Sequence, residues 1–371
     1  MVVIRRYIFI VLLLVLVVKE IVLAKTKISL LNNFLFQSGN GGRQVNDDSG
    51  SEDLSLFQPM LFIESQINEL TNLNIDGVFD TWTAASEKAF DTGTGASGRI
   101  VGETRSGVDI GISHRKKTWI FSPSAGFSDE MDYKSIHGKM NINKSFAEDN
   151  FNIGVGYRYY EDSARLYDII GKTWLDWLPR RTHSVDAAVS QILSRKDIVL
   201  IGCGITRQSG YLEGNRNTVK VAGTRILEVL PDKRNKFVST LRHVHGLNDV
   251  LALHTDYRYY RDDWDIRAHT LEPSLAFALQ EDAGLLQLIY RYSQQSKAKY
   301  YGDEFAVPEQ YMTSDSDLAS FHSDEAGIRY SYEWDTKSVF DNMEAGGSVF
   351  YYVRSNDLSA VIFQLSIGGS F

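Results

Sequence analysis

Alternation of apolar and polar side chains, repeated in segments of about ten residues, constrains the fold of this chain more than any other feature. The C-terminal segment is the clearest case, because its odd-numbered positions are apolar and the positions between them are mostly polar or small. The apolar parity holds Val361, Phe363, Leu365, Ile367 and Phe371. Successive side chains of a strand point to opposite faces, so this segment predicts a strand with one apolar and one polar face.

Further segments repeat this pattern along the chain, at 151–160, 251–259, 286–293 and 328–335. Each has about the length of a tilted strand that crosses a membrane. No apolar run after the first residues is long enough for a transmembrane helix, and a closed barrel satisfies its backbone hydrogen bonds without helices. The sequence therefore predicts an all-β fold, a transmembrane antiparallel outer-membrane β-barrel.

The links between these segments alternate in length, as the periplasmic turns and outer loops of bacterial barrels do. Counting back from the last strand predicts about 16 strands. A count of 14 or 18 is acceptable, because the region 210–230 could hide a hairpin. The short links are expected near 70–72, 114–116, 146–149, 194–197, 246–248, 281–283 and 337–345, and the long outer loops near 38–53, 88–103, 162–182, 209–235 and 297–323.

The N-terminal residues have the pattern of a signal peptide. Arg5 and Arg6 precede an apolar run of about a dozen residues, and Val22-Leu23-Ala24 then supplies a small-residue cleavage site. We expect cleavage after Ala24, which leaves residues 25–371 as a single barrel domain exported to the outer membrane. An uncleaved anchor helix is the alternative.

Charge and cysteine content exclude several classes of function. The formal net charge of −8 argues against nucleic-acid binding, which needs a basic face. Cys203 is the only cysteine, so the chain has neither a disulfide framework nor a thiolate metal cluster. No cofactor is predicted, and membrane lipid is the expected environment.

Three segments share a Tyr-Arg-Tyr pattern, at 157–159, 257–259 and 290–292. The phase of the strands directs the tyrosines to lipid at the headgroup level and the arginines into the lumen. We also expect His254 and His269 to face each other across a hairpin at Asp262, both pointing inward. The predicted lumen charge cluster consists of Arg158, His254, Asp256, Arg258, Asp265, Arg267, His269 and Arg291. Two interpretations stay open for it: a salt-bridge ladder that braces the barrel, or a charged constriction that selects solutes.

Other titratable groups give weaker signals. His243 and His245 lie two apart on one face of a strand, but no carboxylate or third ligand is close in sequence, so no metal site is predicted. The loop 303–324 carries six carboxylates that could bridge divalent ions or bind a surface ligand, or simply form a solvated face.

A lipid-facing hydrolase could be assembled from Ser239, His243 and Asn235. The chain lacks a Gly-x-Ser-x-Gly elbow, a phosphate-binding loop and a zinc-protease motif. We therefore predict that the protein is not an enzyme.

Two resemblances add to this interpretation. The last strand, with Phe363 and the terminal Phe371, resembles the C-terminal targeting signal of outer-membrane proteins, which implies the barrel-assembly machinery as a transient partner. The segments 91–97, 128–135, 257–266, 290–305 and 311–318 resemble an uncharacterised bacterial outer-membrane β-barrel family, domain of unknown function 3570. The first segment departs from the family, which usually has Pro where Ser97 stands.

The family resemblance supports the fold and brings no established activity. Its members are often encoded beside a flavin-attaching transferase and a thioredoxin-like protein, which implies a periplasmic redox partner. The first functional hypothesis is a pore, transport or envelope-assembly barrel. The second is a loop-mediated interaction module or a structural barrel linked to a periplasmic redox system, and the third is an outer-membrane hydrolase.

Overall fold

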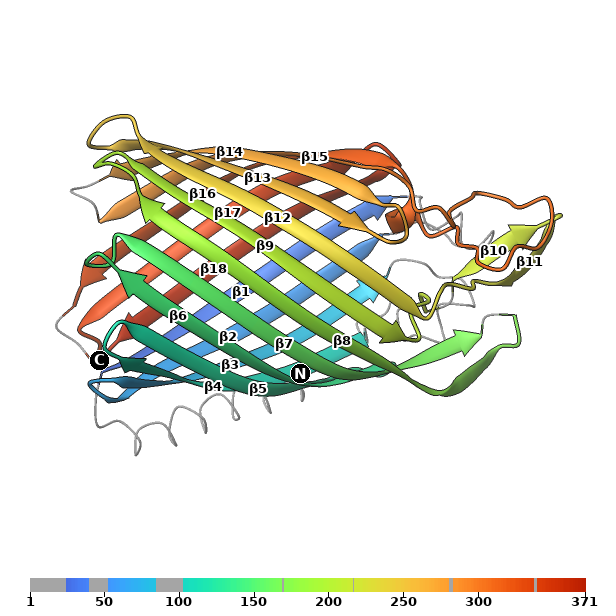
Figure 1. Ribbon diagram of the computed structural model, residues 1–371, viewed down its shortest axis with the longest axis horizontal. Coiled ribbons are helices and arrows are strands. Elements are labelled where there is room, and N and C mark those ends of the chain that lie inside the picture. The colour runs from blue at the N-terminus through green and yellow to red at the C-terminus, as the bar shows by residue number, and fades with distance from the viewer. Residues whose placement is uncertain are drawn as a thin grey trace.

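A computed structural model describes residues 25–39, 53–84, 103–168, 170–215, 217–279, 283–336 and 339–371. Sixteen antiparallel strands form a closed barrel, as the sequence predicts (Figure 1). The predicted signal peptide with Ala24, the segment 91–97 and most of the expected loops at 38–53 and 88–103 lie outside the described residues.

The barrel wall follows the chain from β1 to β9 and from β12 to β18, and β18 then pairs with β1. The first nine strands are β1 (Thr26–Gly39), β2 (Leu54–Asn68), β3 (Thr71–Ala84), β4 (Glu103–Lys116), β5 (Trp119–Asp129), β6 (Tyr133–Phe146), β7 (Phe151–Asp168), β8 (Thr173–Ile192) and β9 (Asp197–Gly210). The others are β12 (Lys233–Gly246), β13 (Leu251–Asp262), β14 (Arg267–Leu279), β15 (Gly284–Gln295), β16 (Phe321–Asp335), β17 (Asn342–Arg354) and β18 (Leu358–Ser370).

Closure between β1 and β18 leaves the wall without an edge strand. The pairing continues to the last residue, where the Phe371 and Thr26 backbones exchange two hydrogen bonds of 2.9 and 3.0 Å. The Phe371 ring also meets the Phe340 ring edge-on, with centroids 5.6 Å apart. A closed sheet satisfies its backbone groups without water, as a membrane-spanning wall must.

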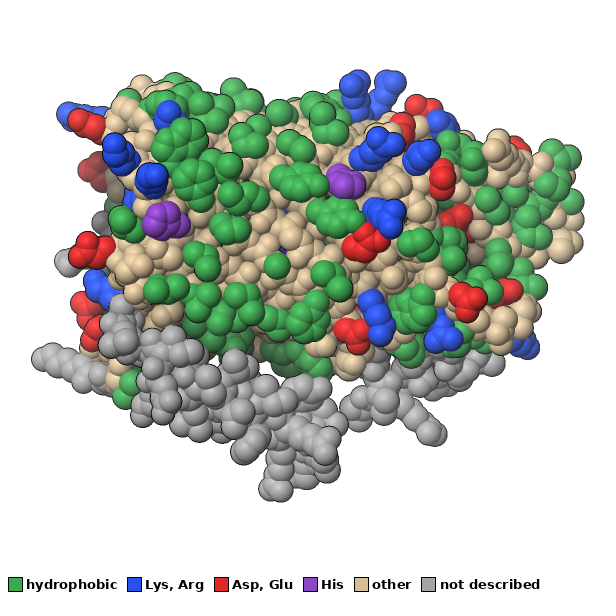
Figure 2. Space-filling model, turned by 60° about the horizontal axis from the view of Figure 1, so that its bottom comes forward, with side chains coloured by type: hydrophobic (Ala, Val, Ile, Leu, Met, Phe, Trp, Pro, Cys, Tyr) green, Lys and Arg blue, Asp and Glu red, His purple; other side chains and the backbone are tan. Residues whose placement is uncertain are grey.

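The outward face of the wall carries the apolar parity of each strand. Ile136 is 70% exposed, Ile201 60% and Leu365 56%. A surface with so many exposed apolar side chains is unfavourable in water and favourable in lipid. Figure 2 shows hydrophobic side chains spread over this face, while charged side chains gather toward the two ends of the barrel. The protein is an outer-membrane β-barrel.

None of the helices among the described residues is long and apolar enough to cross a membrane.

At one end of the barrel, the long links 211–232 and 296–320 occur together with short turns at 130–132, 263–266 and 355–357. The described links at the opposite end, where the C-terminus lies, are short, as predicted (Figure 1). Two of them use residues with positive φ, Lys117 at 57° and Asp149 at 67°. An even number of strands and a periplasmic C-terminus place the longer loops outside the cell.

One predicted loop is wrong. The segment 162–182 is not a loop, because β7 and β8 continue as a hairpin and pair as far as Asp168 and Thr173, beyond the neighbouring strands (Figure 1). Cross-strand aromatic contacts support this arm: Tyr167 lies 5.3 Å from Trp174, and the Arg165 guanidinium lies 5.3 Å from the same indole ring.

The region 210–230 does hold a hairpin, formed by β10 (Thr218–Val221) and β11 (Thr224–Leu227), but it lies outside the wall. It packs with the loop between β15 and β16, and we call residues 211–232 and 296–320 together the cap. The two segments pair at Val221 with Phe305 and at Val229 with Met312. One apolar cluster lies within the cap and consists of Val219, Val221, Phe305 and Met312. A second cluster joins the cap to the link between β13 and β14 and consists of Leu230, Ala298 and Leu318 from the cap with Trp264 and Ile266 from the link.

Candidate functional site in the lumen

Five members of the predicted charge cluster lie on the lumen side of the wall. Tyr157, Tyr257, Tyr290 and Tyr292 are exposed on the outward parity, as predicted, so the residues between them point inward. The inward members are Arg158, His254, Asp256, Arg258 and Arg291.

The predicted positions of the other three are wrong. Residue pairs across a sheet share a face, and His269 pairs with Tyr259 rather than with His254, so His269 points outward and its Nδ1 bonds the Tyr257 hydroxyl at 2.7 Å. Arg267 has the same parity and also points outward. Asp265 lies in the turn with φ 67°, outside the strands. The length of this turn sets the hairpin register, and a shift of one residue exchanges the two faces.

Ion pairs cover much of the inner wall around β12 to β16. Arg242 Nε lies 2.6 Å from Asp256 Oδ1. Arg291 bridges two acids, with Nε 2.6 Å from Glu272 and Nη1 3.2 Å from Glu325. Elsewhere on the wall Arg158 pairs with Asp186. These ion pairs are compatible with the salt-bridge interpretation, and they include acids outside the predicted cluster, namely Asp186, Glu272 and Glu325.

Arg258 differs from its neighbours in this ladder. Among the residues that the structure describes, no ion pair joins Arg258 to a carboxylate, and its side chain is exposed to the lumen. Two adjacent hollows, with volumes of about 540 and 470 Å³, share Arg258 and Arg291 as lining residues. Arg258 thus presents to the lumen a guanidinium that no carboxylate of the described residues pairs with.

A second inward cluster lies across the barrel on β4 and β6. Asp109 Oδ1 accepts hydrogen bonds from Lys139 Nζ at 2.6 Å and interacts with His137 Nε2 at 2.8 Å. The His137 ring stacks at a tilt on Tyr160, with centroids 5.0 Å apart. Sequence reasoning missed this cluster, although the strand parity that singles out Arg158 also directs these side chains inward.

The cap reaches into the outer mouth of the lumen. Its 3-10 helix η3 (Ser316–Leu318) lies against inward residues of β15 and β17. Gln295 Nε2 donates to the carbonyls of Asp317 and Ala319 at 2.9 and 2.8 Å. The buried Arg354 donates to the Ser316 carbonyl and to the Asp317 carboxylate. Helix η3 therefore narrows the outer mouth on one side.

A buried ion pair between β12 and β13 lies at the barrel rim, next to the apolar cluster that joins the cap to the wall. The Asp262 carboxylate is fully buried and lies 2.5 Å from Arg234, and it also accepts the Tyr260 hydroxyl at 2.7 Å. The Arg234 guanidinium lies 4.2 Å from the centre of the Trp264 ring, which belongs to this cluster. Removing either partner would leave an uncompensated buried charge.

Two carboxyl groups lie inside the cap, on different segments. Asn217 donates to Asp315 at 3.1 Å and to Glu228 at 3.5 Å, and Thr313 and the Gly214 amide also donate to Glu228. Burial raises the pKa of Glu228 to about 7, against the opposing effect of these donors. Burial likewise raises the pKa of Asp315.

The carboxylates of the loop 303–324 do not converge on one point. Asp303 accepts the Tyr301 hydroxyl, Asp317 pairs with Arg354, and Asp324 accepts the Tyr290 hydroxyl. Each of these acids has a partner within the protein, so their arrangement does not support the divalent-ion interpretation.

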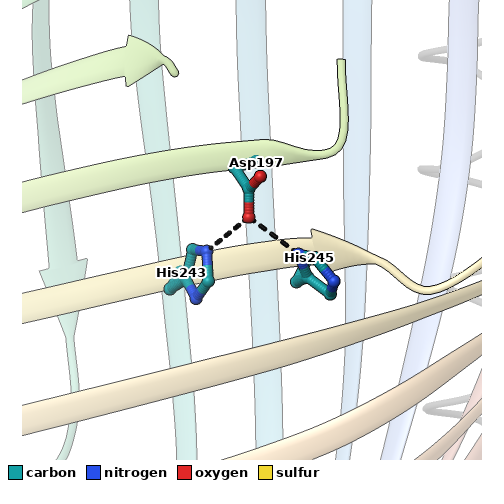
Figure 3. Close-up of side chains that lie close together, drawn as sticks. All are labelled: Asp197, His243 and His245. Atoms are coloured by element: carbon teal, nitrogen blue, oxygen red, sulfur yellow. Dashed lines mark hydrogen bonds and ion pairs between the residues drawn. The ribbon is translucent and has the colours of Figure 1, made fainter. Parts of the chain in front are cut away.

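The hydrolase candidates share the outward face but do not form a catalytic array. Asn235 donates to Asp263 at 2.7 Å, and His243 interacts with Asp197 rather than with Ser239. His245 interacts with the same carboxylate (Figure 3). No carboxylate lies close to the two histidines in the sequence. The pairing of β9 with β12 brings Asp197 beside them.

Comparisons with known proteins agree with this architecture. A family model described as "Protein of unknown function (DUF3570)" matches residues 178–371. A solved structure described as a bacterial polysaccharide outer membrane secretin is similar over 93% of this chain and 98% of its own, with a TM-score of 0.53 and 9% identity. At that identity the similarity shows the fold alone.

Two further structures cover as much of the chain at lower TM-scores. OccK1 (OpdK) of Pseudomonas aeruginosa has a TM-score of 0.45 at 8% identity and covers 94% of this chain and 99% of its own. A FadL homologue of the same organism has a TM-score of 0.43 at 10% identity and covers 93% and 90%. No curated protein matches the sequence.

Proposed function

The chain belongs to the DUF3570 family of proteins of unknown function, and from its geometry we propose that it is a water-filled outer-membrane pore for small hydrophilic solutes. One observation carries the proposal: the lumen-exposed guanidinium of Arg258, which no described carboxylate pairs with, lines two adjacent hollows on the inner wall of a closed 16-stranded barrel. Barrels of this strand number are wide enough to leave an aqueous channel.

The charges of the inner wall suggest which solutes such a pore favours. The paired groups around Arg242 and Arg291 carry two positive and three negative charges, so they leave this part of the wall with one excess negative charge. Arg258 adds a positive charge that no described carboxylate neutralises. Charged side chains that line a pore bias it toward ions of opposite sign, so we expect Arg258 to offset the excess negative charge of this ladder and to shift the selectivity of the pore toward anions.

The reversal potential of the protein in a planar bilayer, under a gradient of potassium chloride, tests this proposal. Relative to the wild type, R258A should shift the potential toward cation preference, and R258E should shift it farther in the same direction. R261A is the matched control, because Arg261 lies on the same strand but points outward. A potential that is the same for R258E and R261A would show that Arg258 does not contact the conducting path.

A second candidate function rests on the cap, which has an apolar cluster of its own and so presents a folded surface outside the cell. In this proposal the cap binds an extracellular partner, or it acts as a gate over the lumen. Arg354 separates the two alternatives, because it holds η3 at the mouth. A gate predicts larger conductance for R354A, whereas a binding surface alone predicts unchanged conductance.

The proposal also includes two partners that the sequence predicts, the barrel-assembly machinery and a periplasmic redox protein. Phe363 lies on the outward face of β18 and Phe371 continues its pairing with β1, an arrangement that suits a strand read during barrel assembly. Deleting Phe371 should lower the yield of folded barrel in cells while leaving refolding of the purified chain intact. Equal losses in both assays would point to a structural role instead. The periplasmic redox partner stays a prediction.

A further inference from the structure

We propose that Asp197, His243 and His245 form a binding site for a divalent transition metal, of which Zn²⁺ is the representative, on the outward face of the barrel at its periplasmic end. His243 Nε2 lies 3.1 Å and His245 Nδ1 2.7 Å from the same oxygen, Asp197 Oδ1 (Figure 3). All three ligand atoms lie within 4.8 Å of one another.

The sheet itself sets this geometry. His245 is the direct cross-strand partner of Asp197, and His243 pairs with Val199 two residues farther along, so the three side chains share one face. Leu241, on the same parity, is 44% exposed, which identifies that face as the outward one. Adjacent hydrogen-bonded strands fix the ligands before any ion arrives, so binding does not have to order the backbone.

The distances suit a small ion with imidazole and carboxylate ligands. Zinc bonds of about 2.0–2.1 Å in a tetrahedron place neighbouring ligand atoms about 3.3 Å apart. The observed separations of 2.7 and 3.1 Å approach that value and need only small side-chain rotations. Imidazole ligands favour zinc, copper and nickel, whereas calcium and magnesium prefer oxygen donors.

A second group orients the carboxylate. Ser194 Oγ donates to Asp197 Oδ2 at 2.7 Å, and the Lys196 amide donates to Ser194 Oγ at 3.0 Å. The turn thus occupies one carboxylate oxygen and leaves Oδ1 to face the imidazoles, as groups behind metal ligands commonly do. Three protein ligands leave at least one coordination position for a water molecule or an anion.

Both imidazoles are accessible, with side-chain exposures of 44% for His243 and 38% for His245. An ion can therefore enter from the periplasmic surface without opening the barrel. The site lies on the opposite face of the wall from Arg258, so it is independent of the proposed pore.

Metal binding to the untagged full chain, folded in detergent and treated with a chelator, tests the proposal. Zn²⁺ titrated against a chromophoric competitor should bind at one ion per barrel. D197N and H245A should each weaken binding by at least about tenfold, and S194A by about tenfold. H269Q is the matched control, because His269 is an exposed outward histidine that bonds only a tyrosine hydroxyl among the described residues.

Co²⁺ gives a second measurement, since its visible spectrum reports tetrahedral coordination by the folded chain. H245Q is a second variant at this position that should fold, because glutamine can still donate to Asp197. Heat-modifiable mobility on gels checks that its barrel has formed. Binding that is equal in H245A and H269Q, or well below one ion per barrel, would mean an adventitious ion only and would overturn the proposal.

Discussion

Glu228 should make the stability of the cap depend on pH. The side chain is only 5% exposed, and burial raises its pKa from 4.5 to about 7. Because the folded value lies above the value of the unfolded chain, the folded cap binds the proton more tightly. The protonated Glu228 carboxyl therefore contributes fully to the free energy of unfolding of the cap below pH 4.5, and this contribution is lost as the pH rises through 7.

The size of the effect follows from the two pKa values. At about 1.4 kcal/mol for each pH unit, the cap loses about 3 kcal/mol of its free energy of unfolding between the two limits. Asp315 acts in the same direction, since burial and the nearby Asp317 both raise its pKa, while Arg354 opposes this. Replacement of Glu228 by glutamine removes the larger share of the pH dependence, because the amide stays neutral.

Limited proteolysis of the cap, followed between about pH 5 and pH 8, measures this dependence. The wild-type cap should become up to about 100-fold easier to cleave as the pH rises, whereas E228Q should change much less. E309Q is the matched control, because Glu309 is an exposed carboxylate on the other segment of the cap. Wild-type cleavage that stays constant, or slows as the pH rises, would refute the reasoning.

Two further substitutions test the packing of the wall and its rim. D262N should destabilise the barrel rim at β12 and β13 by about 3–5 kcal/mol, because Arg234 keeps its buried charge without a partner. Increased hydrogen exchange of the rim amides would report the loss, and unchanged exchange would contradict the prediction. G327A should lower the temperature of heat denaturation by displacing Phe350, since an added Cβ would lie 2.1 Å from Phe350 Cδ1, at a cost of about 1–3 kcal/mol. G347A, where the nearest atom lies at 3.6 Å, should have a smaller effect, and equal effects would argue against the packing explanation.

The fold follows from the sequence because the membrane imposes a strict pattern on each strand. Lipid demands apolar side chains on one face, so alternation such as that of Phe363, Leu365 and Ile367 reveals both the strand and its orientation. The pattern ends where the strands leave the membrane. The sequence therefore predicts a loop where the β7–β8 arm continues beyond Asp162. Cross-strand contacts such as that of Tyr167 with Trp174 stabilise this arm, and lipid does not impose alternation on it.

The candidate site was harder to predict, because it depends on register and on contacts between distant segments. His269 was assigned to the lumen, and the register of the β13–β14 hairpin turns it outward. Asp197 lies 46 residues before His243, so only strand pairing reveals their proximity. The cap likewise joins Glu228 to Thr313 across 85 residues, a contact that no local pattern indicates.

Cysteine labelling tests the central claim most directly, namely that Arg258 lines an open path through the barrel. In a Cys203→Ser background, R258C and Y257C place single thiols on opposite faces of one strand. A charged, water-soluble thiol reagent should reduce the conductance of R258C barrels in a planar bilayer and leave that of Y257C barrels unchanged. Folded R258C barrels that do not conduct, or whose conductance ignores the reagent, would contradict the account.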